Sequence, residues 1–284
     1  MSNTSLFYTK DGASVSADLM DTALRGIGAD QTDILFVHTD LSFGMPNFKL
    51  SRSVLCSEIL DVILGLGVKT ICFPTFTFSF CNGVAYDVRS SKTPMGVLNE
   101  AFRKRADVVR SLDPLMSVAV WGQHMEIATK IGTHSCGAGS SFDILRKLSA
   151  TQRVKFLFFG TRPHLCATYT HYVERCLDVP YRYDRAFTGK VTDINGVSEE
   201  KTFWLNVRYQ GVKAFKDARL EEAMDSMGMI RSSPVGEAGA YILSEADLFN
   251  TTADNIRANA NYMLDQPYDG TKETAFFADH MVAL

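Results

Sequence analysis

Three consecutive segments in the first quarter of the chain restrict the fold more than any other part of the sequence. DILFVH (33–38) and KTICFP (69–74) are short apolar runs typical of buried strands. Between them, SRSVLCSEILDVILGLG (51–67) has the periodicity of a helix, begins at Ser51 or Ser53 and ends at glycines. A strand, a helix and a second strand at this spacing predict a βαβ unit with parallel strands.

The same alternation continues through the middle of the chain. Further helices are predicted at 96–106 and 141–149, and further strands at 117–122 and 155–160. Because strands that alternate with helices form a sheet covered on both faces, we expect an α/β fold. The specific prediction is a three-layer α/β/α sandwich around a mixed sheet, with an antiparallel hairpin added to it.

The hairpin is predicted at about 185–208, where the alternation of helix and strand breaks. Two strand-like runs there flank Asn195-Gly196, a dipeptide typical of tight hairpin turns. Helix and strand patterns return at 216–228, 240–244 and 245–264. We therefore expect a single domain over 1–284, with the hairpin as an insertion and a loosely held tail at about 265–284.

Composition argues against several classes of function. With 284 residues, 46% of them hydrophobic, the chain can bury a large core. Its 29 basic and 32 acidic residues give a net charge of -3, too weak to suggest nucleic acid or an anionic membrane as the main partner. The start of the chain lacks a signal-peptide pattern, and no apolar stretch reaches the roughly 18 to 20 residues of a membrane span. We expect a cytoplasmic globular protein, with a homodimer as one open option.

The six cysteines show no paired spacing, so we expect reduced, mostly buried thiols and no structural zinc or other metal. A thiol near a histidine can act as a covalent nucleophile, and Cys136 and Cys166 keep a cysteine-dependent mechanism open. Neither lies in a recognised nucleophile signature.

Four polar segments follow predicted strands, which is where open α/β sheets bind ligands. They are HTDLSFG (38–44), PTFTFSF (74–80), RSLDPLMS (110–117) and GTRPHLCATYTHYVE (160–174). Backbone amides of the first could hold an amide-bearing ligand, or its side chains could satisfy their own turn. The second is either a cleft wall with an aromatic and a hydroxyl face or an ordinary strand. In the third, Arg110 could bind phosphate or carboxylate, or pair with Asp113.

The fourth segment contains Thr168, His171 and Glu174, three residues apart and therefore on one face of a helix. A histidine with a pKa near 6.5, raised somewhat by the glutamate, suits removal of a proton from an ammonium group at neutral pH. The alternative is a core or capping histidine that is satisfied by one hydrogen bond.

Six motifs in this order resemble those of the coenzyme A-dependent aminoglycoside 3-N-acetyltransferase family. They are VHTDLSFG, PTFTFSF, TPMGVLNEAFR (93–103), RSLDPLMS, SSFDILRKL (140–148) and TYTHYVE, and the resemblance extends from about residue 30 to 264. Two positions depart from the family pattern, since Asp40 stands in place of a serine and Asp113 in place of a histidine.

The resemblance implies an N-acetyltransferase with acetyl-CoA as donor, in which His171 and Glu174 act as the base and Thr168 belongs to the same catalytic centre. The coenzyme is expected to contact residues of three segments: His38, Thr39, Asp40, Leu41, Ser42, Phe43, Gly44, Arg110, Ser111, Ser117, Ser141 and Phe142. The acceptor is expected to contact Thr75, Phe76, Thr77, Tyr86 and Asp87. The hydroxyls of Thr75 and Thr77, or backbone amides, are candidate donors to the reaction's oxyanion.

The two departures lead us to expect an amino sugar, linked to a nucleotide and used in surface polysaccharide biosynthesis, as the acceptor. An aminoglycoside antibiotic is the alternative acceptor. Further alternatives are a cysteine-dependent acyl hydrolase and a non-catalytic binding protein.

Overall fold

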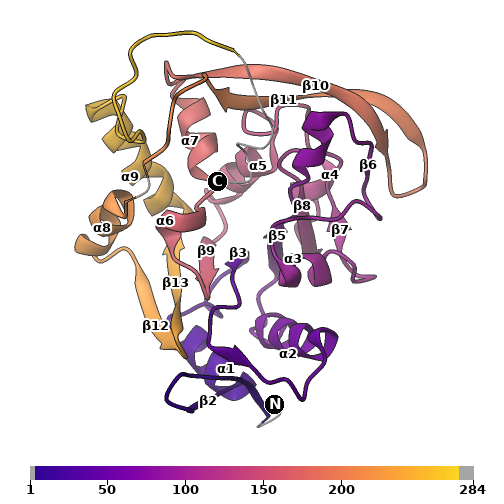
Figure 1. The fold of residues 1–284 in the computed structure, drawn as a ribbon, viewed down its shortest axis with the longest axis vertical. Helices are drawn as coiled ribbons and strands as arrows, with labels where there is room; N and C mark the ends of the chain where they lie inside the picture. The colour runs from indigo at the N-terminus through magenta and orange to yellow at the C-terminus, as the bar shows by residue number, and fades with distance from the viewer. Residues whose placement is uncertain (1–3, 216, 275–284) are drawn as a thin grey trace.

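A central mixed sheet organises the computed structural model, which describes residues 4–215 and 217–274 (Figure 1). Its seven strands, from one edge to the other, are β12 (Arg231–Val235), β13 (Ala238–Ser244), β9 (Val154–Phe159), β3 (Ile34–Thr39), β5 (Thr70–Pro74), β8 (Val118–Gly122) and β7 (Val109–Arg110). Strand β3 pairs in parallel with β5 and β9, and the other neighbours are antiparallel. The predicted βαβ unit and the mixed sheet are both confirmed.

The sheet separates two hydrophobic cores because successive side chains of a strand point to opposite faces. In β3, Ile34 and Phe36 belong to one core, whereas Leu35 and Val37 belong to the other. All four side chains are fully buried, as expected of a strand covered on both faces.

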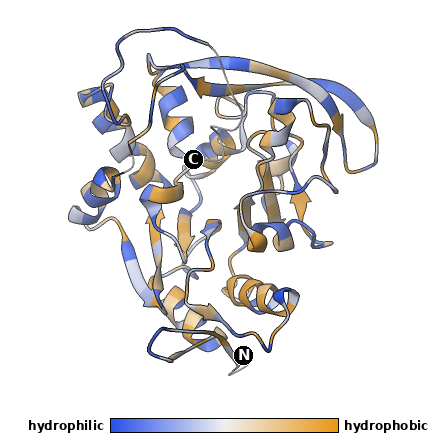
Figure 2. Cartoon of the chain, viewed as in Figure 1, coloured by the Kyte–Doolittle hydropathy of each residue, from blue (hydrophilic) through white to orange (hydrophobic). Residues whose placement is uncertain are grey.

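Helices cover both faces, which confirms the three-layer sandwich. The first face carries α1 (Ala17–Gly26), α2 (Arg52–Leu64) and α3 (Val97–Phe102). The opposite face packs against α4 (Glu126–Thr129), α5 (Ser141–Leu148), α6 (Pro163–Cys166), α7 (Thr170–Cys176), α8 (Arg219–Ser226), α9 (Glu245–Ala258) and the 3-10 helix η1 (Phe78–Asn82). In Figure 2 the strands β5, β8 and β13 are largely hydrophobic, as their place between the layers requires.

The hairpin is a long antiparallel ribbon formed by β10 (Arg182–Thr192) and β11 (Ser198–Arg208). We call it the ribbon, and it arches over one end of the sheet (Figure 1). Its turn contains Gly196 at φ +84°, a backbone conformation that favours glycine. The outer end of β10 pairs with β6 (Tyr86–Asp87). A separate small sheet joins β2 (Ser14–Ser16), β1 (Ser5–Tyr8) and β4 (Met45–Pro46).

The tail contacts this ribbon as far as the structure describes it. The Tyr268 ring stacks on Tyr209 at 5.9 Å between centroids, and the Tyr183 hydroxyl donates to the Thr274 carbonyl at 3.0 Å. Tyr268 and Thr274 therefore contact the ribbon and the residue after it; the loosely held tail stays a prediction, and the rest of it lies outside the described residues. In the described part of the chain, no helix combines the length and apolar character needed to span a membrane.

Candidate active site

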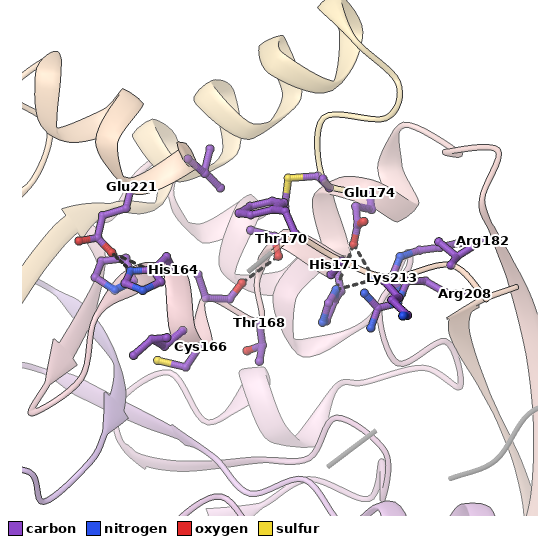
Figure 3. Close-up of a pocket in the computed structure, with 18 of the residues that line it drawn as sticks. His164, Cys166, Thr168, Thr170, His171, Glu174, Arg182, Arg208, Lys213 and Glu221 are labelled. Atoms are coloured by element: carbon purple, nitrogen blue, oxygen red, sulfur yellow. Dashed lines mark hydrogen bonds and ion pairs between the residues drawn. The ribbon is translucent and has the colours of Figure 1, made fainter. Parts of the chain in front are cut away.

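Helix α7 places His171 beside Glu174, one turn further along the helix (Figure 3). His171 Nδ1 lies 3.0 Å from Glu174 Oε2, and the other carboxylate oxygen accepts a hydrogen bond of 2.8 Å from the Tyr181 hydroxyl. Glu174 is only 3% exposed, so its carboxylate is held by the protein rather than by solvent. The pair therefore has the fixed geometry that a proton-transfer group needs.

Arg182, at the start of β10, completes this arrangement. Its Nη2 atom lies 2.8 Å from Glu174 Oε2 and 3.0 Å from His171 Nδ1. Because a guanidinium only donates hydrogen bonds, Nδ1 cannot accept from Arg182 and also donate to Glu174. Arg182 already has an acceptor in the carboxylate, so we assign the imidazole hydrogen to Nδ1, donating to Glu174. Nε2 is then the nitrogen with a free lone pair.

Electrostatics keep this imidazole neutral. Burial, and then the positive charge of Arg182, lower the pKa of His171, and these effects outweigh Glu174, which acts in the opposite direction. Our expectation of a raised pKa was therefore wrong, because the sequence motif does not show that the glutamate is already paired with an arginine. Burial raises the pKa of Glu174, but Arg182 and then His171 outweigh it and lower the pKa to about 2. The carboxylate therefore stays ionised.

His171 and Glu174 form part of the wall of a pocket of about 560 Å³. Its other walls come from α6, the start of β10, the end of β11, segment 212–215 and α8. Thr168 also lines it, just before α7 begins, and its Oγ1 atom is buried with no hydrogen-bond partner among the described residues. All three residues of the T-x-x-H-x-x-E motif are therefore brought together at one cavity.

A second histidine–carboxylate pair lies at the other end of the same pocket (Figure 3). His164 Nδ1 is 2.6 Å from Glu221 Oε2, and the backbone amide of His164 donates to the same oxygen at 3.0 Å. Arg162 Nε donates to the other oxygen of Glu221 at 2.8 Å. Glu221 is thus fully engaged in joining α6 to α8.

A model of the family described as aminoglycoside 3-N-acetyltransferase matches residues 70–257. The chain belongs to this family. The match confirms the predicted family and enzyme class, a coenzyme A-dependent N-acetyltransferase that uses acetyl-CoA and acts on a small-molecule amine. The search of curated protein sequences found no match.

Solved structures of acetyltransferases share the fold. The structure of aminoglycoside acetyltransferase AAC(3)-Xa is 20% identical with a TM-score of 0.72, covering 88% of this chain and 94% of that one. AAC-IIIb, solved with CoASH, is 16% identical with a TM-score of 0.69, covering 89% and 98%. AAC-VIa, solved with sisomicin, is 17% identical with a TM-score of 0.70, covering 86% and 97%.

The family match overturns the predicted nucleotide-linked amino sugar and the role in polysaccharide biosynthesis, and it favours the alternative, an aminoglycoside acceptor. That prediction depended on two departures from the family pattern. Asp113, one of them, is only 5% exposed and accepts hydrogen bonds from the Leu115 amide at 2.8 Å and the Ser135 hydroxyl at 2.9 Å. It stabilises a loop of this acetyltransferase, so its identity carries no information about the acceptor.

The predicted coenzyme segment 38–44 is divided between core and surface. His38 stacks on Phe158 with ring centroids 5.0 Å apart, and burial lowers its pKa to about 3. The side chains of His38 and Phe43 are buried in the core, and the predicted contact of this segment with the coenzyme through backbone amides stays a prediction. The side chains of Asp40 and Ser42 are exposed, and those of Thr39 and Leu41, with Gly44, are partly exposed. The Asp40 amide donates to the Phe159 carbonyl at 3.0 Å, so this loop lies beside the end of β9, from which the chain leads into α6.

The predicted phosphate ligand Arg110 lies inside the enzyme at 5% exposure. Each of its guanidinium nitrogens donates to the protein, with acceptors on Thr75, Thr77, Ser91 and Ser117. Four of its five N–H donors are therefore engaged within the protein, which favours a structural role for Arg110, and its predicted contact with coenzyme phosphates stays a prediction.

The remaining predicted contacts in this region have buried side chains, and their roles toward the ligands stay predictions. They are Ser111, Ser117, Ser141, Phe142, Thr75, Phe76, Thr77 and Tyr86, with exposures from 0% to 5%. The 74–80 segment is not a strand wall; β5 ends at Pro74, and η1 begins at Phe78. Asp87 is partly exposed, but its carboxylate accepts from the Arg89 amide at 2.7 Å in a local turn.

The residues that sequence reasoning missed come from the ribbon, the segment after it, α6 and α8. Arg182, Arg208 and Lys213 lie at the His171 end of the pocket, and His164 and Glu221 lie at the other end. The only signal in the sequence was the hairpin itself, whose two ends must meet if Asn195-Gly196 forms the turn.

Proposed function

We propose that this enzyme transfers the acetyl group of acetyl-CoA to an amino group of an aminoglycoside, with His171 as the general base. The observation that carries this proposal is the hydrogen bond of 3.0 Å between His171 Nδ1 and Glu174, which leaves Nε2 to accept a proton inside the pocket. The family description and the acceptors named in related structures support the choice of an aminoglycoside.

The chemistry assigned to the chain is a proton transfer that frees the nucleophile. Acetyl-CoA supplies the acyl group as a thioester. His171 Nε2 takes a proton from the acceptor ammonium, and the neutral amine then forms the C–N bond while the C–S bond breaks. The proton held by His171 passes to the departing sulfur, and the acylated nitrogen then loses its second proton to the neutral His171, so the products are the amide, the coenzyme A thiol and one released proton. Glu174 stabilises the imidazolium formed between these steps.

Direct transfer is favoured over a cysteine-bound intermediate. Burial raises the pKa of Cys166 and of Cys136 to about 12, so neither is a thiolate at neutral pH. The Cys166 sulfur lies 3.6 Å from the Thr161 hydroxyl rather than beside a base. A thiol in that state is a poor nucleophile, so holding the amine and the thioester together is the simpler scheme.

For coenzyme A, the accessible part of the 38–44 segment remains our proposed contact. Thr39, Asp40, Leu41 and Ser42 follow the carboxyl end of β3, the edge at which open α/β sheets bind ligands. We also propose that the enzyme acts in the cytoplasm, and the homodimer stays a prediction for light scattering to test.

The test measures free thiol release from acetyl-CoA with a panel of aminoglycosides. His171→Ala should lower kcat by about 100-fold to 10,000-fold, the usual contribution of a general base, and leave the affinity for coenzyme A within a few-fold. His134→Ala is the matched control, because His134 is half-exposed, stacks on Trp204 and does not line this pocket. An active His171→Ala enzyme, or a wild type that acetylates no aminoglycoside, contradicts the proposal.

A further inference from the structure

Two arginines face each other across the ribbon at the pocket. Arg182 and Arg208 are direct partners in the register of β10 and β11, and both line the cavity that contains His171. Like charges directly opposite each other on neighbouring strands repel and destabilise a sheet. This placement therefore needs a compensating negative charge.

The protein supplies that charge to only one of them. Glu174 forms its ion pair with Arg182 at 2.8 Å. Within residues 4–215 and 217–274, no carboxylate forms an ion pair with Arg208, and its Nη1 atom is buried without a hydrogen-bond partner. Burial and the neighbouring Arg182 lower the pKa of Arg208 to about 10, so it still carries its charge at neutral pH.

A third cation adds to the positive charge at this end of the pocket. Lys213, on the segment after β11, lines the same end of the pocket, and no ion pair involves it in the described part of the chain (Figure 3). Lys213 is exposed, but the buried Nη1 atom of Arg208 has no partner and costs the folded protein stability, and such features persist where function requires them. The missing partner is then expected to arrive with a ligand.

We propose that Arg208 binds an oxyanion of the reactants beside His171. The identity of the reactants rests on the function proposed above. One source of the oxyanion is the acyl carbonyl oxygen, which becomes negatively charged as the amine attacks. The other is a carboxylate or phosphate group on the acceptor; aminoglycosides carry neither, so this source would also contradict the proposed acceptor. The phosphates of coenzyme A are a poor fit, because the pantetheine arm separates them from a thioester placed at His171.

The first experiment probes the site with inorganic phosphate and needs no turnover. Calorimetry should detect phosphate binding to the wild type, and Arg208→Gln should weaken it by about tenfold or more, as expected for loss of a charge-assisted hydrogen bond. Arg208→Lys should retain part of the affinity. Lys201→Gln, on the same strand but paired with Glu199 outside the pocket, should bind like the wild type and controls for net charge.

Thermal stability should change in the direction opposite to phosphate affinity in the Arg208→Gln variant. Because Arg208→Gln removes an unpaired cation next to Arg182, its melting temperature should be equal to or higher than that of the wild type. Phosphate should raise the melting temperature of the wild type and leave that of Arg208→Gln unchanged.

Steady-state kinetics then separate the two sources. If the anion is the acyl oxygen, Arg208→Gln lowers kcat by about 100-fold or more with little change in the KM of the amine. If the anion belongs to the acceptor, the KM of the amine rises instead.

Failure of the wild type to acetylate any amine would refute the proposed function, whereas the phosphate titration would still decide on Arg208. The inference is overturned if the wild type and Arg208→Gln bind phosphate equally, or if neither binds it, and if kcat and KM are also unchanged wherever turnover is seen.

Discussion

Two arginines, the buried Arg110 and the partly exposed Arg208, show how differently the enzyme treats the same side chain. The Nη1 atom of Arg110 donates to the Ser91 carbonyl at 2.6 Å, and its Nη2 atom donates to the Thr77 hydroxyl at 2.7 Å. Nη1 of Arg208 is buried in the pocket wall with no partner among the described residues. The protein provides acceptors for all three nitrogens of the first guanidinium, whereas the second keeps a buried nitrogen that we propose for a ligand.

This difference separates a structural cluster from a binding site of similar composition. Around Arg110, the hydroxyls that suggested a ligand-binding wall in the sequence are used as internal acceptors, and Thr75 and Thr77 are fully or almost fully buried. Around His171, the protein leaves a cavity and unsatisfied polar atoms. Hydrogen-bond saturation, rather than residue type, distinguishes the two regions.

The largest effect expected from this comparison is on stability. Arg110→Met should lower the free energy of unfolding by about 3 kcal/mol or more, because it leaves several buried oxygens without a donor. Urea denaturation followed by circular dichroism would measure this change.

Arg105→Met provides the matched control, since Arg105 forms an ion pair of 2.9 Å with Asp107 at the surface. Its effect should stay below about 1 kcal/mol. If Arg110→Met unfolded like the wild type but bound coenzyme A more weakly, Arg110 would be a ligand-binding residue and the comparison would fail.

Much of the fold was predictable because it follows from local periodicity. The strands β3 and β5, with helix α2 between them, lie within a few residues of the segments that their apolar patterns predicted. Ser51 caps α2, accepting from the Val54 amide at 3.3 Å, as a serine before a helical pattern suggests. These features depend on neighbours in sequence, which a single chain displays directly.

The candidate site was predictable only where it is local. His171 and Glu174 are one helical turn apart, so their contact follows from spacing alone. Arg182 and Arg208 meet through the register of a long ribbon, and burial, followed by the charge of Arg182, reverses the expected direction of the His171 pKa shift. Contacts between residues far apart in sequence depend on tertiary packing, which apolar periodicity does not encode.

A smaller effect is expected at Thr168, whose hydroxyl has no partner in the described protein. If that hydroxyl serves a ligand, Thr168→Val should lower kcat/KM by about tenfold, the value of one hydrogen bond, without loss of stability. Thr170 lines the same pocket, but its hydroxyl donates to the Ala167 carbonyl at 2.9 Å. Thr170→Val should therefore lose about 1 kcal/mol of stability and keep its kinetics. The reverse pattern would show that saturation does not mark the functional threonine.

The smallest effect concerns pH. A general base works only when neutral, so kcat/KM should fall as the pH drops through the pKa of His171 in the free enzyme. Burial and Arg182 lower this pKa, and Arg208 contributes in the same direction. The acidic limb of the pH–rate profile, where kcat/KM falls with decreasing pH, should therefore lie below pH 6.5. Arg208→Gln removes one nearby positive charge and should move the limb to higher pH, whereas Lys201→Gln should not. A limb above pH 6.5 in the wild type would mean that Glu174 dominates the environment of His171. A limb unmoved in Arg208→Gln would mean that the two groups are not electrostatically coupled.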